Sequence, residues 1–333
     1  MSSDLLAAAA IPVIAATIVD DLGAVRVSEM LWPCRFSDGG RWVSPVTVEL
    51  PDGVLLPPFA YFGGKSRVAS QIVRLLPDHE HYVEPFCGGL SVLLAKSSVP
   101  FETVNDLDGD LMLFWRMLRD FPADLERVCV LTPHSRGEYV AAAQVGDCDD
   151  LERARRVWVR LSQGQAGGQR GTGWRHHVDP GGSTHGMPSR LGGYVGRVGP
   201  VAERLANVSL ECMPALEVIA KYGAESSALL YCDPPHLGST RTSQNNVYRQ
   251  EMKMPGQHRL LAEAVADCAE AVVVSGYASA LYDRLYAGWW RREIEASTGQ
   301  GSVWAARTEI LWSNRPFRDD DAQPSLFECG VAD

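Results

Sequence analysis

The sequence lacks an apolar run long enough to cross a membrane. Its most apolar stretch extends for about 15 residues from Leu5 to Val19 and has no basic flank, whereas a spanning helix needs about 20 residues and a secretion signal begins with positive charge. Eight cysteines are present, but no two of them form a CxxC pair or belong to a cysteine and histidine set at zinc spacing. We therefore expect a cytoplasmic protein with reduced thiols and no bound metal.

A net positive charge, which helps a protein to bind nucleic acid, is also missing from the chain as a whole. The formal net charge is -10, yet the segment from Arg153 to Arg204 holds nine arginines, no lysine and only two acids. A DNA-facing module on an acidic enzyme would show this asymmetry. Arginine both binds phosphates and reads guanine, so the predicted DNA contacts are Arg170, Arg175, Arg190 and Arg197. The alternative is a solvated basic face with a flexible glycine loop.

The order of apolar segments predicts a mostly parallel α/β sheet. A strand at 82–83 leads into a glycine loop at 84–89 and a helix, and a second strand at 102–105 precedes another helix. Two such units in succession indicate parallel strands. The pattern breaks between about 121 and 205 and then resumes, with strands at 208–210, 228–232 and 271–274. Segments near 289–290 and 308–312 are expected to pair as edge strands.

The break in the pattern divides the chain into four parts. Residues 1–55 contain four prolines and no long periodic run, so we predict an extension of unknown role. A catalytic domain would comprise residues 56–120 and 206–318, with a partly helical insertion at 121–205 and a C-terminal tail at 319–333. A chain of 333 residues is long enough for a catalytic domain and a second, smaller one.

The tetrapeptide Asp233-Pro234-Pro235-His236 directly follows a buried strand, at the edge where parallel sheets bind ligands. The prolines fix an extended backbone and lack N–H groups, so carbonyl oxygens stay available beside the Asp233 carboxylate. Two such acceptors suit an exocyclic base amine, because accepting both of its N–H bonds favours a tetrahedral, more nucleophilic nitrogen. A planar ring after the prolines can stack on an extruded base. The alternative is an ordinary proline turn with a capping aspartate.

Five motifs in order resemble the Dam-type family of DNA adenine methyltransferases, over the chain from Tyr61 to about Asn314. The motifs are Tyr61-Phe62-Gly63-Gly64-Lys65, Glu84-Pro85-Phe86-Cys87-Gly88-Gly89, Asn105-Asp106, Tyr231 to His236 and Ser275-Gly276-Tyr277. The resemblance implies a class I S-adenosylmethionine methyltransferase fold, α/β and Rossmann-like, with a target-recognition domain at 121–205. It also implies methyl transfer from S-adenosylmethionine, which becomes S-adenosylhomocysteine, to the N6 amine of a flipped adenine in double-stranded DNA. Phage and restriction-modification enzymes are of this kind.

The same resemblance implies roles for individual residues. Tyr61 and Lys65 would contact the cofactor, Asp106 would hold its ribose hydroxyls, and Asp233 would bridge the cofactor and the target amine. The remaining residues implied for the cofactor site are Gly63, Glu84, Phe86 and Gly88. Plain alternatives are a solvated Lys65 and an Asp106 that caps a helix.

One residue departs from the family pattern, because the tetrad ends in His236 where the family has tyrosine. The imidazole can stack, but its protonation would place a cation beside the reacting amine. A tolerated replacement, an altered base preference and impaired catalysis therefore all stay open. The rival functions are an N4-cytosine DNA methyltransferase, a catalytically silent DNA-binding protein and, more weakly, a methyltransferase of glutamine amides in proteins. The motifs do not define the DNA sequence that is recognised. A monomer and a weak dimer both stay open as oligomeric states.

Overall fold

The computed structural model of the chain describes residues 16–19, 25–28, 54–144, 146–168, 173–176, 186–238, 250–299 and 304–318. Contacts divide the chain into two compact units, Met1–Thr47 and Val48–Asp333. In the first unit, β1 (Ala16–Val19) pairs antiparallel with β2 (Val25–Ser28). All five sequence motifs lie in the second unit.

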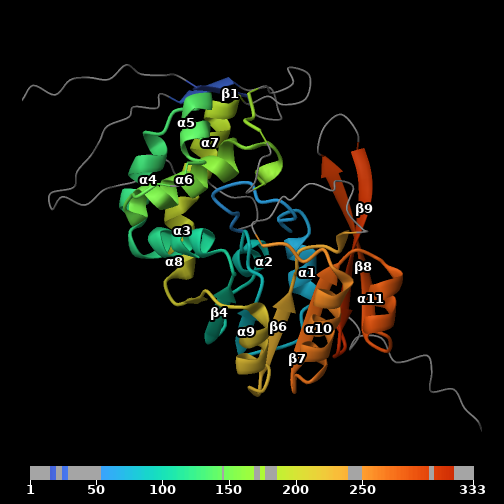
Figure 1. The fold of residues 1–333 in the computed structure, drawn as a ribbon. Coiled ribbons are helices and arrows are strands. Elements are labelled where there is room, and N and C mark those ends of the chain that lie inside the picture. The colour runs from blue at the N-terminus through green and yellow to red at the C-terminus, as the bar shows by residue number, and fades with distance from the viewer. Residues whose placement is uncertain are drawn as a thin grey trace, which may run out of the picture. The chain divides into compact units, whose positions relative to one another are not determined.

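A seven-stranded sheet forms the centre of the second unit, in the order β5-β4-β3-β6-β7-β9-β8 (Figure 1). The strands are β3 (His81–Glu84), β4 (Phe101–Asn105), β5 (Ser209–Glu211), β6 (Ala228–Cys232), β7 (Ala271–Gly276), β8 (Trp290–Gly299) and β9 (Trp304–Ser313). The five strands β3 to β7 are parallel, and β9 runs antiparallel between β7 and β8. This sheet confirms the mostly parallel α/β fold that the sequence predicted.

The two C-terminal strands pair with each other as expected, but the prediction that both are edge strands was wrong. Strand β9 pairs with β7 on one side and with β8 on the other. Its residues Ile310, Leu311 and Trp312 are all buried, and burial on both faces is typical of a strand inside a sheet.

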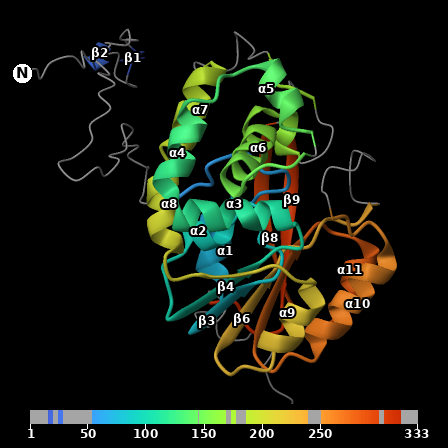
Figure 2. The same ribbon diagram turned by 60° about the vertical axis from the view of Figure 1, so that its left-hand side comes forward.

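Helices cover both faces of the sheet (Figure 2). The first face packs against α1 (Ala69–Leu75), α2 (Ser91–Ala95) and α3 (Gly109–Asp120), and the second against α9 (Ala215–Tyr222), α10 (Pro255–Ala266) and α11 (Ala280–Leu285). Alternate residues of β6 join the two apolar cores, with Leu229 and Tyr231 in the first and Leu230 and Cys232 in the second. Burial on both sides explains the unbroken apolar run of this strand.

Further helices gather beside α3 in the described part of residues 121–205, which we call the inserted segment. They are α4 (Pro122–Val130), α5 (Arg136–Ala141), α6 (Asp150–Gln163), α7 (Met187–Val195) and α8 (Val198–Leu205), with a short 3-10 turn at Gln165–Gly167. Trp158 of α6 and Val201 of α8 share one apolar cluster with Trp115 of α3. Because that cluster continues into the sheet, the borders of a separate recognition domain stay a prediction.

Within the described ranges, no helix has the length and apolar character to span a bilayer.

The strand order reverses between β3 and β6, since the chain adds β4 and β5 on one side and β7 on the other. A reversal of this kind opens a crevice at the carboxyl ends of the strands, where ligands bind in such sheets. Glu84 is the last residue of β3, Asn105 is the last of β4, and Asp233 directly follows β6. Three of the sequence motifs therefore meet at one edge.

Candidate active site

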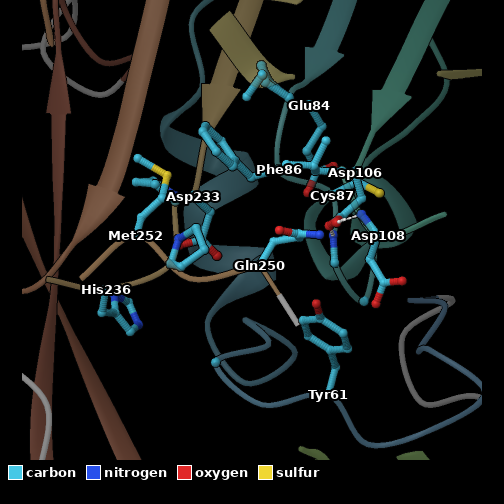
Figure 3. A pocket seen from close by; sticks show the side chains of 18 of the residues that line it. Tyr61, Glu84, Phe86, Cys87, Asp106, Asp108, Asp233, His236, Gln250 and Met252 are labelled. Carbon is cyan, nitrogen blue, oxygen red and sulfur yellow. Dashed lines mark hydrogen bonds between the residues drawn. The ribbon is translucent and has the colours of Figure 1, made fainter. Parts of the chain in front are cut away.

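A cavity of about 430 Å³ opens at the carboxyl ends of β3, β4 and β6. Its volume is within the range of small-molecule sites. Asp233 and His236 lie at one end of the cavity, and Asp106 and Asp108 at the other (Figure 3). Every residue predicted for the cofactor and catalytic sites lines this cavity: Tyr61, Gly63, Lys65, Glu84, Phe86, Gly88, Asp106, Asp233, Pro234, Pro235 and His236.

Asp233 belongs to a buried cluster of charges. Lys65 Nζ donates to Asp233 Oδ1 at 2.7 Å and to the Gly63 carbonyl oxygen at 3.3 Å. Glu309 Oε1 lies 3.4 Å from the same Nζ, and it accepts a hydrogen bond from Ser275 Oγ at 2.5 Å. The side chain of Lys65 is only 5% exposed, so the alternative of a solvated lysine was wrong. Among the described residues, the Asp233 carboxylate accepts from Lys65 alone, which leaves Oδ2 for a substrate.

The pKa values of this cluster follow from its burial. Burial raises the pKa of Asp233 to about 6, Lys65 lowers it and Glu309 raises it. Burial by itself would lower the pKa of Lys65, but the carboxylates of Asp233 and Glu309 hold it well above its ordinary value. Burial also raises the pKa of Glu84, although Tyr82 donates to that carboxylate at 3.1 Å. At neutral pH, Asp233 is therefore mostly a carboxylate beside a lysine cation.

Two glycines allow the Tyr61 ring to lie against the loop that follows β3. A Cβ on Gly88 would come 2.6 Å from Tyr61 Cε1, and one on Gly89 would come 2.9 Å from Tyr61 Cβ. Gly88 also has φ +45°, a conformation that glycine adopts without strain. Trp115 Nε1 of α3 donates to the Gly88 carbonyl oxygen at 3.1 Å, which holds the loop in place. The loop is thus both a tight strand-to-helix turn and one wall of the cavity.

Asp106 presents a carboxylate to the other end of the cavity. Its Oδ2 accepts from the Gly88 backbone N–H at 3.1 Å, and its Oδ1 accepts from that of Asp108 at 2.9 Å. The N-cap of α3 is Asp108, so the helix-cap alternative for Asp106 was wrong. A carboxylate offers about four acceptor positions, so Asp106 could also accept from a ribose hydroxyl. The Asp106 carboxylate and the glycine loop that follows β3 therefore fit S-adenosylmethionine.

His236 already has an aromatic partner within the chain. The residue is 6% exposed, and its ring stacks on that of Tyr277 with 4.3 Å between centroids and 30° between planes. Tyr277 directly follows β7 and belongs to the last of the five motifs. Stacking of His236 on an extruded base stays a prediction.

The four arginines predicted to contact DNA differ in their surroundings. Arg170 lies outside the described residues. Arg175 and Arg190 are half-buried neighbours, and burial followed by the charge of Arg190 lowers the pKa of Arg175. Arg197 is engaged within the protein, because its Nη1 donates to the Pro57 carbonyl oxygen at 2.8 Å. Arg175 and Arg190 are therefore the better placed candidates.

A stack of three rings, which sequence reasoning missed, lies in the same region. The Trp174 ring is 4.7 Å from that of His134 and 5.9 Å from that of His176 between centroids. The Arg136 guanidinium lies 4.9 Å from the Trp174 ring.

No group of histidine, cysteine and acidic side chains in the described part of the chain could hold a metal, and His177 and His185 lie outside that part.

Three hydrogen bonds join the inserted segment to residues 57–62, the stretch that contains Tyr61. The bonds run from Trp158 Nε1 to the Pro58 carbonyl at 2.9 Å, from Arg197 Nη1 to the Pro57 carbonyl, and from the Phe62 N–H to the Gly167 carbonyl at 3.0 Å. Gly167 has φ +63°, and a Cβ there would lie 2.5 Å from the Ala60 carbonyl oxygen. The inserted segment thus holds one wall of the cavity directly.

Comparison with known proteins agrees with the motifs. A family model described as D12 class N6 adenine-specific DNA methyltransferase matches residues 61–162. The Type II methyltransferase M1.LlaDCHI of Lactococcus lactis subsp. cremoris is 27% identical over 282 residues, which cover 78% of this chain and 95% of that protein.

Solved structures show weaker likeness. A SAM-dependent methyltransferase from Agrobacterium tumefaciens is 11% identical at a TM-score of 0.35, covering 84% of this chain and 76% of that one. A precorrin 8W decarboxylase from Methanobacterium thermoautotrophicum is 13% identical at a TM-score of 0.33, covering 80% and 98%.

Proposed function

We infer that this chain, whose resemblance to the adenine-specific DNA methyltransferases is confirmed by the D12 match, transfers a methyl group from S-adenosylmethionine to the N6 amine of adenine in DNA. The observation that carries this proposal is the state of Asp233. One of its carboxylate oxygens is held by Lys65 at 2.7 Å, and the other is left for the target amine in a cavity that also contains Asp106.

Asp233 and the backbone after it would prepare the amine for attack. Asp233 Oδ2 accepts one N–H of the target amine, and the Pro234 carbonyl oxygen accepts the other. Neither Pro234 nor Pro235 has an N–H group that could compete for these acceptors. Two accepted hydrogen bonds localise the nitrogen lone pair, which is otherwise delocalised into the base.

S-adenosylmethionine, when bound, supplies an electrophilic methyl group on its sulfonium. The methyl group would pass to the amine nitrogen as its bond to sulfur breaks, and Asp233 Oδ2 would accept the proton that this nitrogen loses. A pKa of about 6 suits this step, because a carboxyl group with a pKa near the working pH can both accept the proton and return it to solvent.

The substrate in this proposal is double-stranded DNA with one base extruded. Arg175 and Arg190 of the inserted segment would contact phosphates or guanine, and His236 would lie against the extruded base. A monomer could carry out the reaction, because all the predicted cofactor and catalytic residues line one cavity of a single chain. Methylation of cytosine at N4 would use the same acceptors, but the comparisons do not favour it.

The direct test uses tritium-labelled S-adenosylmethionine and unmethylated DNA of mixed sequence, followed by digestion to nucleosides. We expect label in N6-methyldeoxyadenosine from the wild-type protein and none above background from Asp233→Ala. The matched control is Asp283→Ala, which removes an exposed carboxylate on α11 and should leave transfer unchanged.

Two other outcomes would change the proposal. Label in N4-methyldeoxycytidine would preserve the mechanism and overturn the base assignment. An absence of label from the wild type, with DNA and S-adenosylhomocysteine both bound, would overturn the enzymatic proposal and favour a DNA-binding protein in which His236 marks a lost activity.

A further inference from the structure

Glu309 is a buried acid in the middle of the interior strand β9. It is 4% exposed, and it is not among the residues that line the cavity. A buried carboxylate is costly unless it is paired. It contacts Lys65, which is the partner of Asp233, and Ser275 of β7.

We propose that Glu309 is a positioning residue for methyl transfer, which acts through Lys65 to keep Asp233 Oδ2 free for the target amine. This inference rests on the proposed function of Asp233. It adds a residue that lies outside the motifs from which that function was predicted.

The geometry at the Lys65 ammonium supports this role. A lysine has three N–H donors, and three acceptors surround Nζ, namely Asp233 Oδ1 at 2.7 Å, the Gly63 carbonyl at 3.3 Å and Glu309 Oε1 at 3.4 Å. The Ser275 hydroxyl fixes the position of the Glu309 carboxylate. The ammonium is thus drawn toward β9 as well as toward Asp233.

Without the charge of Glu309, Asp233 would be the only anion paired with this ammonium. Lys65 would then move closer to Asp233 and occupy both carboxylate oxygens. The target amine would lose its acceptor, and the carboxylate would become less basic. Glu309 therefore divides the attraction of the lysine between two carboxylates.

The charged and titratable groups that face Asp233 come from several elements. They are Lys65 before α1, Glu84 of β3, Tyr231 of β6, Tyr282 of α11 and Glu309 of β9. Within this set, Lys65 stabilises the Asp233 anion and Glu309 opposes it. Replacing Glu309 by a neutral isostere must therefore lower the pKa of Asp233 and move the acidic limb of the rate profile to lower pH.

The test compares Glu309→Gln with Glu295→Gln, which makes the same change at an exposed position on β8. For Glu309→Gln we expect kcat to fall about tenfold, as for the loss of one hydrogen bond in the transition state, and the acidic limb of kcat/KM to move to lower pH. Affinity for S-adenosylhomocysteine, measured by calorimetry, should change less than about threefold, because Glu309 does not line the cavity. Glu309→Asp retains the charge and should keep the wild-type limb.

Two outcomes would overturn the inference while leaving the proposed function intact. One is an active wild type with a Glu309→Gln variant whose kcat and acidic limb are both unchanged. The other is a variant that loses S-adenosylhomocysteine affinity and melting temperature together without any movement of the limb, which would assign Glu309 to folding alone. A wild type that transfers no methyl group would instead overturn the proposed function and this inference with it.

Discussion

Removing the cation beside Asp233 should move the pH dependence of the reaction in a defined direction. In Lys65→Met, the buried ammonium is replaced by a neutral side chain of similar length, and two carboxylates, Asp233 and Glu309, are left in the cluster. The charge that lowers the pKa of Asp233 is then absent, whereas burial and Glu309 still raise it. The acidic limb of kcat/KM must therefore move to higher pH, opposite to the change expected for Glu309→Gln.

The size of the effect follows from the distance between the two groups. An opposite charge at hydrogen-bond distance lowers a carboxyl pKa by about 1 to 3 units, and the Lys65 ammonium is 2.7 Å from Asp233. Removing it should raise the pKa from about 6 to between about 7 and 9. At pH 7 the ionised fraction of Asp233 would fall from about nine-tenths to between about one-half and one-hundredth.

The assay is kcat/KM for methyl transfer to DNA, measured between pH 5 and about 9.5, which lies below the ordinary pKa of lysine, about 10.4. Lys65→Arg retains a cation and should keep the limb near its wild-type position, and Lys221→Met removes an exposed cation of α9 as a control. Because Lys65 also lines the cavity, affinity for S-adenosylhomocysteine is measured in parallel. A Lys65→Met profile that is lower at every pH but has an unshifted limb would refute the electrostatic reasoning.

Three further predictions follow from the walls of the cavity. Gly88→Ala should reduce cofactor affinity at least about tenfold, as measured by calorimetry. The reason is that its Cβ would meet the Tyr61 ring at 2.6 Å and that its φ is +45°. Gly192→Ala on α7, where a Cβ would enter open space, should leave the affinity unchanged. Gly167→Ala should weaken cofactor and DNA binding together, since its Cβ would meet backbone that cannot rotate away. Burial raises the pKa of Asp106 from 3.8 to about 6, so the folded cofactor-free protein binds that proton more tightly than the unfolded chain. The contribution of Asp106 to the free energy of unfolding must therefore fall by up to about 3 kcal/mol as the pH rises from about 4 to about 6. In urea unfolding, the stability of the wild type relative to Asp106→Asn should fall by this amount over the same range.

The sequence predicted the members of the cavity well because the motifs follow strands. Parallel strands present their carboxyl ends at one edge of a sheet, so Glu84, Asp106 and Asp233 had to come together once their strands were identified. Glu309 carries no such signal, because its partner Lys65 lies far away in the chain. The only hint was a single acid within the apolar run Thr308 to Trp312, which in a buried strand requires a partner.

Charge counting and helical periodicity were less informative in the inserted segment. A count of arginines cannot distinguish a guanidinium that faces DNA from one that, like Arg197, bonds the backbone of another segment. Helices α7 and α8 form despite Gly192, Gly193 and Gly199. Tertiary packing stabilises them, through Leu191 and Val201 among others, and packing commonly outweighs helix propensity.

The contacts between the inserted segment and residues 57–62 have a thermodynamic consequence. The same short stretch carries Tyr61 into the cavity, accepts hydrogen bonds from Trp158 and Arg197, and donates one to the Gly167 carbonyl. On the proposed function, we expect a ligand that orders this stretch to affect the inserted segment, which carries Arg175 and Arg190. Binding free energies are reciprocal, so a cofactor that tightens DNA binding must itself be bound more tightly when DNA is present. On the proposed function, the hydrogen bonds at residues 57–62 would couple DNA binding to the assembly of the methyl-transfer site.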